Sequence, residues 1–264
     1  MSASTVQEGT LSGGHPYLRL GDGDPLVVLR GFTPTHTNPR QGLQRSTELR
    51  ILRPLAEHFT VYAVNRRPGL PEGTTMTDIA ADHAVALADE FGGPTHVLGM
   101  STGGSVALQL AVDHPGAVCR LVIAAAAYRL GPLSKQAQLR YGELVGSGRR
   151  GGHALAPVMV GSRIGQIAAS PLMRLLDPAP DDPSDMLAVI HAEDAFDVED
   201  RLGEITAPTL VIGGDRHLCY STEMFRQTAR GIPDARLLLY PRCGHGGTFI
   251  RRRFGSDVTG FLSS

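Results

Sequence analysis

The sequence has few cysteines and no long apolar run, and each absence excludes a class of protein. Its three cysteines, Cys119, Cys219 and Cys243, are odd in number and far apart, so they offer neither a disulfide framework nor a paired metal motif. The longest apolar run, 121–128, is far too short to span a bilayer, and residues 1–10 lack the cationic start and apolar stretch of a signal peptide. We therefore expect a cytoplasmic protein in a reducing compartment.

An excess of charge of one sign is also missing, because 25 lysine and arginine residues stand against 26 aspartate and glutamate residues. Without a basic field, the chain has nothing to attract nucleic acid or an anionic membrane, so we expect neither partner. Hydrophobic residues make up 42% of the chain, which excludes general disorder, and 32 glycines with 18 prolines indicate many turns. The length of 264 residues favours one domain that carries an insertion.

Motifs for a metal or a cofactor are absent as well. The sequence contains no H-E-x-x-H, no P-loop lysine motif and no G-x-G-x-x-G, and its ten histidines do not have the spacing of metal ligands. We therefore predict that the protein uses neither a metal nor a cofactor.

What the sequence does contain is an alternation of apolar strand patterns with helical patterns. Strands are predicted at 26–29, 60–64, 95–98 and 120–127, and helices at 77–91 and 102–114. Residues 48–58 also have helical spacing, which Pro54 interrupts. Such alternation is typical of right-handed βαβ units, which form a parallel sheet with helices on both faces. The predicted fold class is therefore α/β.

The alternation stops after residue 130 and resumes near residue 206. Between these points the pattern predicts helices at 134–145, 163–176 and 184–191, separated by GSGRRGG and DPAPDDP. It then continues with a strand at 209–212, a helix at 221–230, a strand at 236–240 and an amphipathic segment that ends near Leu262. We therefore assign 1–130 and 206–264 to an α/β core and 131–205 to a helical insertion.

Ser101 lies in the sequence GMSTG, residues 99–103, which matches the nucleophile-elbow pattern G-x-S-x-G. A bare match to so short a pattern is weak. Here, however, a predicted strand leads into the motif and a predicted helix leads out of it, as an exposed serine on a tight strand-to-helix turn requires. Ser101 is thus a candidate nucleophile, with a plain glycine-rich turn as the alternative.

From about His15 to its end, the chain resembles the α/β-hydrolase family, whose Ser, acid and His follow in this chain order. The resemblance implies that His245, in the sequence CGHG after the strand at 236–240, is the general base for Ser101. It also implies that 131–205 is a cap over the active site. The family's oxyanion hole implies the backbone amides of Thr102 and Phe32.

Two positions depart from the pattern of this family. Arg30 stands before Gly31 where the family has histidine, and it could pair either with a nearby acid or with a substrate carboxylate. At the spacing where the family has its catalytic aspartate, this chain has His217, and Asp215 comes two residues earlier. Asp215 is our candidate for the acid, although His217 could instead orient His245 through a neutral ring nitrogen.

Other locations for the acid are less favourable. The strand at 120–127 is followed by Tyr128 and offers no carboxylate, and Asp194 and Asp197 fit surface or capping roles better. The serine at the elbow also separates this chain from haloalkane dehalogenases and epoxide hydrolases, which use an aspartate there, and the absence of tryptophan removes the indole halide donors of the dehalogenases.

The resemblance implies a serine hydrolase that acts on a carboxylic ester, lactone or thioester of a partly apolar small molecule, through an acyl-enzyme on Ser101. Two other functions stay open. One is a biosynthetic enzyme that uses the same pocket for a non-hydrolytic step, and the other is a catalytically silent receptor for a small ligand.

Overall fold

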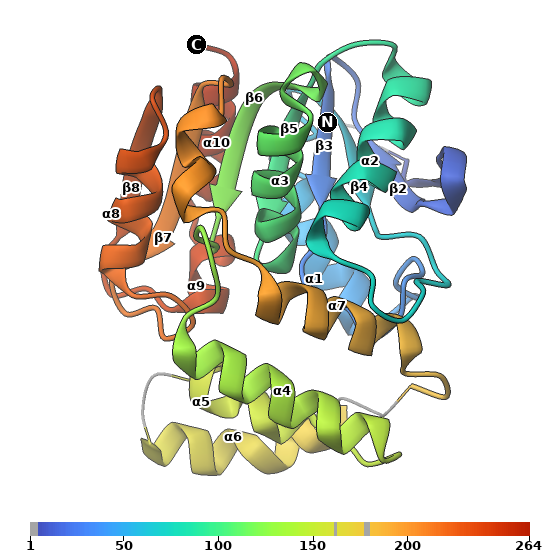
Figure 1. Ribbon diagram of the computed structural model, residues 1–264, viewed down its shortest axis with the longest axis vertical. Coiled ribbons are helices and arrows are strands. Elements are labelled where there is room, and N and C mark those ends of the chain that lie inside the picture. Colours follow the sequence, from blue (N-terminus) through green and yellow to red (C-terminus); the bar gives the residue numbers. More distant parts are fainter. Residues whose placement is uncertain (1–4, 161–162, 177–179) are drawn as a thin grey trace.

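A computed structural model describes residues 5–160, 163–176 and 180–264 of the chain, and an eight-stranded sheet forms its centre (Figure 1). The strand order is β1-β2-β4-β3-β5-β6-β7-β8; β1 and β2 are antiparallel to their neighbours and the remaining pairs are parallel. The strands are β1 (Gln7–Thr10), β2 (Pro16–Leu20), β3 (Pro25–Leu29), β4 (Thr60–Val64), β5 (Thr95–Met100), β6 (Val118–Ala124), β7 (Thr209–Gly214) and β8 (Ala235–Tyr240).

Helices cover both faces of this sheet, which confirms the predicted α/β class. Alternate side chains of each central strand enter opposite cores: Val27 and Leu29 pack on the face of α2 and α3, whereas Leu26 and Val28 pack on the face of α1 and α10. The covering helices are α1 (Leu43–Leu52), α2 (Met76–Phe91), α3 (Thr102–Asp113), α8 (Thr222–Gly231), α9 (His245–Ile250) and α10 (Phe254–Leu262). Short 3₁₀ helices occupy Ser12–Gly14, Pro115–Ala117, Gly152–Leu155 and Glu199–Glu204.

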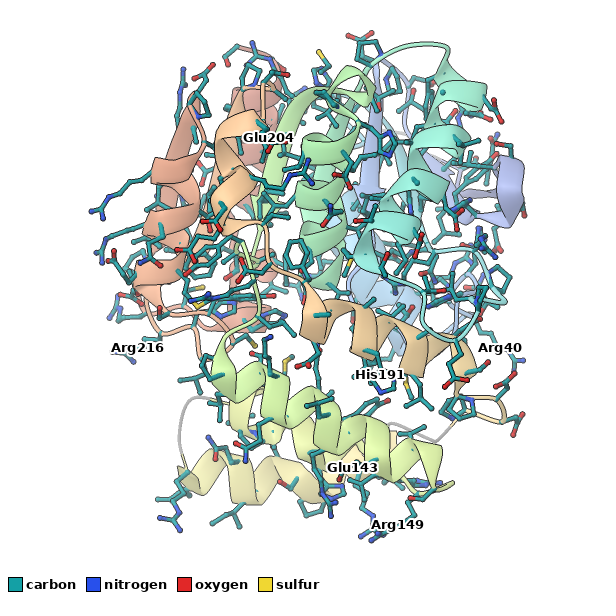
Figure 2. All side chains as sticks on the ribbon, in the orientation of Figure 1. Arg40, Glu143, Arg149, His191, Glu204 and Arg216 are labelled. Carbon is teal, nitrogen blue, oxygen red and sulfur yellow. The ribbon has the colours of Figure 1, made fainter. Side chains whose placement is uncertain are left out.

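The described residues of 131–205 form four α-helices at the end of the sheet to which the arrows of β3 and β6 point (Figure 1). Helix α7 lies nearest the sheet and packs on both α2 and α4, and α5 and α6 lie farther out. Figure 2 places Arg149, which follows α4, at the outer edge of this layer. The four helices are α4 (Pro132–Gly146), α5 (Ala156–Met159), α6 (Arg163–Leu176) and α7 (Ser184–Ala195).

Several boundaries differ from the sequence prediction. The helical spacing at 48–58 corresponds in part to α1, which begins at Leu43 and ends at Leu52, because Pro54 cannot donate the backbone hydrogen bond that would continue the helix. The strand predicted to reach residue 127 ends at Ala124, since Ala125 has a φ of +53°. The antiparallel strands β1 and β2 were not predicted at all.

No helix that the structure describes is both long enough and apolar enough to cross a membrane.

Candidate active site

Ser101 lies at the sharp turn between β5 and α3, with a φ of +53° that side-chain-bearing residues rarely adopt. Its backbone N–H donates to the Ala124 carbonyl at 2.9 Å, which fixes the turn to β6. The flanking glycines are sterically required: a Cβ atom at Gly103 would lie 2.1 Å from the Leu29 carbonyl oxygen, and one at Gly99 would lie 2.5 Å from the Gly103 carbonyl oxygen. The positive φ of Ser101 costs about 1–3 kcal/mol, and the surrounding packing offsets this cost.

Two backbone amides lie beside this turn, from Thr102 and Phe32. Thr102 is the first residue of α3, so its N–H has no partner within the helix and lies at the positive end of the helix dipole. Gly31 holds the loop after β3 against the elbow, because a Cβ atom there would lie only 3.2 Å from the Ser101 Cβ. Among the residues that the structure describes, neither the Phe32 nor the Thr102 amide has a hydrogen-bond partner.

Arg66, which follows β4, organises the loop that presents Phe32. Its guanidinium is buried and donates to the carbonyl oxygens of Arg30 at 3.2 Å and Gly31 at 3.0 Å, and to the Thr33 hydroxyl at 3.1 Å. Burial lowers the pKa of Arg66 to about 10, so the side chain stays cationic at neutral pH. The Gly31 carbonyl and the Phe32 N–H belong to one peptide group, and a cation on that oxygen polarises the N–H. The sequence analysis missed this residue.

Of the two partners expected for Arg30, an acid of the protein or a substrate carboxylate, the structure shows the acid, which is Glu48. Its Nε donates to Glu48 at 2.5 Å, and its Nη1 donates to Asn38 at 3.0 Å. The side chain lines a cavity of about 990 Å³ on the α1 side of the elbow, together with Gly31 and Met100. Arg30 is thus part of a structural ion pair, and its buried Nη2 has no partner among the described residues.

The predicted contact between Asp215 and His245 is wrong. One Asp215 carboxylate oxygen accepts the backbone N–H of Cys243 at 3.2 Å, so this exposed side chain ties the loop after β7 to the loop after β8. The residue at His245 is His217, whose Nε2 lies 2.9 Å from His245 Nδ1. The physical reason is spacing: β7 ends at Gly214, and the chain needs two residues beyond Asp215 before a side chain reaches the imidazole.

His217 is buried and His245 is half-buried, and the pair holds no charge at neutral pH. Burial and the nearby His245 lower the pKa of His217 to about 2, and burial lowers the pKa of His245 to about 4. The rings of Tyr220 and Phe225 pack on His217. The acid position therefore holds a neutral ring in place of the carboxylate that would stabilise an imidazolium.

His245 and Ser101 lie at the same edge of the sheet, since each follows the carboxyl end of a parallel strand. His245 lines a cavity of about 480 Å³ together with Val158 and Met159 from α5. No hydrogen bond between Ser101 and His245 is present within the described ranges. The structure thus brings His245 to His217, and the link from His245 to Ser101 stays a prediction.

Of the remaining carboxylates, the exposed Asp197 pairs with Arg129 at 3.1 Å and accepts the Glu199 N–H at 3.0 Å, as expected of a surface residue. The unexpected one is Glu193 of α7, which is fully buried beneath the elbow. It accepts hydrogen bonds from Thr102 Oγ1 at 2.9 Å, Ser105 Oγ at 2.8 Å and Gln138 Nε2 at 2.9 Å. Burial raises its pKa, and these three donors oppose that change.

One cluster in the described part of the chain has metal-ligand spacing, with the donor atoms of His217, Cys219 and His245 all within 4.8 Å of one another. The hydrogen bonds do not fit a cation. His217 Nδ1 accepts the Tyr220 backbone N–H at 3.2 Å, so the proton of the neutral ring lies on Nε2, the atom that would have to bind the metal. Burial also raises the pKa of the Cys219 thiol to about 12, far from a thiolate ligand.

Comparisons with known proteins agree with this architecture. The sequence model of the Alpha/beta hydrolase family matches residues 26–253. The chain is 31% identical over 202 residues to a protein of Variovorax paradoxus named "Putative carbamate hydrolase RutD", covering 74% of this chain and 75% of that one. It is 25% identical over 239 residues to the pimeloyl-[acyl-carrier protein] methyl ester esterase of Nitrosomonas europaea, covering 85% and 90%.

Solved structures show the same fold. The enol-lactonase from Burkholderia xenovorans superposes with a TM-score of 0.75 at 23% identity, over 98% of this chain and all of that one. An α/β hydrolase from a Medee basin deep-sea metagenome library superposes with a TM-score of 0.79 at 18% identity, over 98% of both chains.

Proposed function

This chain belongs to the alpha/beta hydrolase family and is a hydrolase-type enzyme; from that premise, we propose that it cleaves a carboxylic ester, lactone or thioester through an acyl-enzyme on Ser101. The observation that carries the proposal is the strained elbow, where Ser101 is held in the left-handed region with the Thr102 and Phe32 amides beside it. A fold alone would not specify this chemistry, whereas a half-buried serine at a strained turn, next to unused amide donors, supports it.

In the proposed reaction, the Ser101 oxygen attacks the substrate carbonyl carbon while its proton passes to His245 Nε2. The carbonyl oxygen becomes an oxyanion, which the Thr102 and Phe32 amides stabilise. The tetrahedral intermediate collapses, and the leaving oxygen or sulfur takes the proton from His245. Water then attacks the acyl-enzyme by the same route and releases the acid. The hydrogen bond from Ser101 to His245 would form with substrate bound, as is common in such sites.

We propose that the helices of 131–205 serve as a cap over this site. Tyr141 of α4 packs edge-to-face on the Phe32 ring, with ring centroids 5.5 Å apart, so the insertion contacts one of the two oxyanion residues directly. Val158 and Met159 of α5 line the cavity at His245. A small-molecule substrate would therefore lie between core and cap, with its apolar part facing Ile51, Leu52 or Met100 in the larger cavity.

A fluorophosphonate probe tests the proposal, because it labels only a serine that attacks an acyl-like centre. We expect covalent labelling of the full chain at Ser101, seen as a mass shift on the peptide that contains it, and hydrolysis of short-chain p-nitrophenyl esters. Ser101→Ala should abolish both, whereas Ser147→Ala, at an exposed serine of the insertion, should change neither.

A folded chain that the probe does not label, and that hydrolyses none of these esters, would contradict the proposal. It would favour the alternatives of a non-hydrolytic enzyme or a ligand receptor.

A further inference from the structure

His217 is held by hydrogen bonds that fix where its proton lies. The backbone N–H of Tyr220 points at His217 Nδ1 from 3.2 Å, and a backbone amide can only donate, so this nitrogen carries no proton. A neutral imidazole has one N–H, which must then be on Nε2. His217 Nε2 lies 2.9 Å from His245 Nδ1 and therefore donates to it.

The direction of this bond determines the state of the second ring. Because His245 Nδ1 accepts, the proton of neutral His245 is on Nε2. In this series of hydrogen bonds, Tyr220 donates to His217 and His217 donates to His245. The last group of the series, His245 Nε2, is therefore an N–H donor. A carboxylate at position 217 would reverse this order, since it can accept from both neighbours and donate to neither.

No hydrogen-bond partner among the described residues favours the opposite arrangement, in which His217 is protonated at Nδ1. Moving the His217 proton to Nδ1 would set it against the Tyr220 N–H and lose a buried hydrogen bond, since His217 is only 7% exposed. A second proton on His217 would have to bind at Nδ1, where it would face the Tyr220 N–H. It would also place a cation among the rings of Tyr220, Phe225 and His245. The Asp215 carboxylate does not stabilise such a cation, because it accepts the backbone N–H of Cys243.

We infer that His217 is a positioning residue that holds His245 in the tautomer protonated at Nε2, so that the resting site offers Ser101 a hydrogen-bond donor in place of a base. The Ser101 proton can pass to Nε2 only after the His245 proton has moved to Nδ1, and that state is a minor one. This inference deepens the proposed function, on which its consequence for the rate rests. It predicts that acylation in this chain is slow and that His217 is the cause.

Nitrogen-15 NMR of the imidazoles tests the tautomer in the wild-type full chain at pH 7, with His245 assigned by the loss of its signals in His245→Gln. We expect the chemical shift of an unprotonated nitrogen at Nδ1 and that of a protonated nitrogen at Nε2. Protonated Nδ1 on His245 would overturn the inference. Ser101→Ala should keep the wild-type pattern, which makes this readout independent of whether the protein is a hydrolase.

A matched pair of variants tests the consequence. The side chains of His217→Glu and His217→Gln have the same shape and similar reach, but only glutamate can accept from both Tyr220 and His245. We expect His217→Glu to move the His245 proton to Nδ1 and to raise the rate of fluorophosphonate labelling about tenfold or more. The opposite change, from a triad aspartate to asparagine, lowers kcat about 10⁴-fold in a different protein. His217→Gln should do neither.

Equal labelling rates in two variants that both react with the probe would overturn the assigned role of His217. If the His245 tautomer changes as expected but no variant reacts with the probe, the tautomer assignment holds and the proposed function fails. The wild-type spectrum decides the tautomer even if neither variant folds.

Discussion

Arg66 is a buried cation whose side-chain hydrogen bonds all reach the loop that follows β3. It donates to two carbonyl oxygens, to the Thr33 hydroxyl and to His36 Nε2. A charged group is costly to bury, and here its hydrogen bonds hold the one loop that must place an amide beside Ser101. At the residue scale, the position of the Phe32 amide, one of the two proposed oxyanion donors, therefore depends on the buried side chain of Arg66.

We expect Arg66→Met to lower kcat for an activated ester by about 10- to 100-fold with a small change in KM. Losing one oxyanion donor outright costs about 10²–10³ in kcat in other enzymes, and here the Phe32 amide would be misaligned but still present. Steady-state kinetics well below the melting temperature would measure this effect.

The control is Arg67→Met, because the neighbouring Arg67 is half-exposed and pairs with Asp82 away from the elbow. If Arg66→Met kept the wild-type kcat, as Arg67→Met should, the proposed role of Arg66 in positioning the Phe32 amide would be wrong.

Helices α3, α4 and α7 meet at the Glu193 carboxylate, beneath the elbow. Glu193 belongs to α7, two of its donors belong to α3 and the third, Gln138, belongs to α4. At the element scale, one buried acceptor thus joins the elbow helix to two helices of the insertion. A buried carboxylate with three donors is satisfied, whereas a side chain that cannot accept from all of them leaves a donor without a partner.

Glu193→Gln should lower the free energy of unfolding by about 1–3 kcal/mol, because the amide nitrogen cannot accept, so the group that faces it must reverse its hydroxyl or lose its buried partner. Urea denaturation at pH 7 would show this as a lower midpoint with an unchanged slope.

Glu143→Gln is the matched control, since Glu143 forms only an exposed pair with Arg140 and should change stability by less than about 0.5 kcal/mol. Equal midpoints for the two variants would contradict the structural role of Glu193.

Buried histidines are distributed through the whole molecule and couple its stability to pH. Burial lowers the pKa of His36 to about 4 and that of His83 to about 3, and His245 titrates near 4 for the same reason. In the unfolded chain each imidazole would bind a proton near pH 6.5. The unfolded state therefore binds more protons than the folded state between about pH 6.5 and pH 4, and stability must fall as the pH falls through that window.

We expect the free energy of unfolding to decrease by about 1–2 kcal/mol per buried histidine between pH 6.5 and pH 5, and to level off above pH 7.5. Urea denaturation at a series of pH values would measure the slope. His83→Gln should reduce the slope, because His83 is buried within α2, and His58→Gln at an exposed position should leave it unchanged. A stability that stays constant from pH 7 to pH 5 would refute this coupling.

The sequence by itself determined the features that depend on neighbouring residues. Short, nearly continuous apolar runs that alternate with helical patterns predicted β3 to β8 and the two-faced sheet, and the glycines around Ser101 predicted a turn that only small residues permit. It predicted the helical content of 131–205, although the role of that segment as a cap stays a proposal. It missed β1, whose exposed edge position leaves little apolar pattern to read, and the short strand β2 beside it, in which only Leu18 and Leu20 are buried.

Only the tertiary structure decided which polar side chains meet. His217 and His245 are 28 residues apart in the chain, and Glu193 is 91 residues from Thr102. Sequence spacing allowed either Asp215 or His217 to contact His245. In the structure, the loop after β7 places His217 against His245. The physical reason is that helix and strand patterns arise from sterics within a few residues, whereas a buried hydrogen bond requires that two distant segments place a donor and an acceptor within about 3 Å.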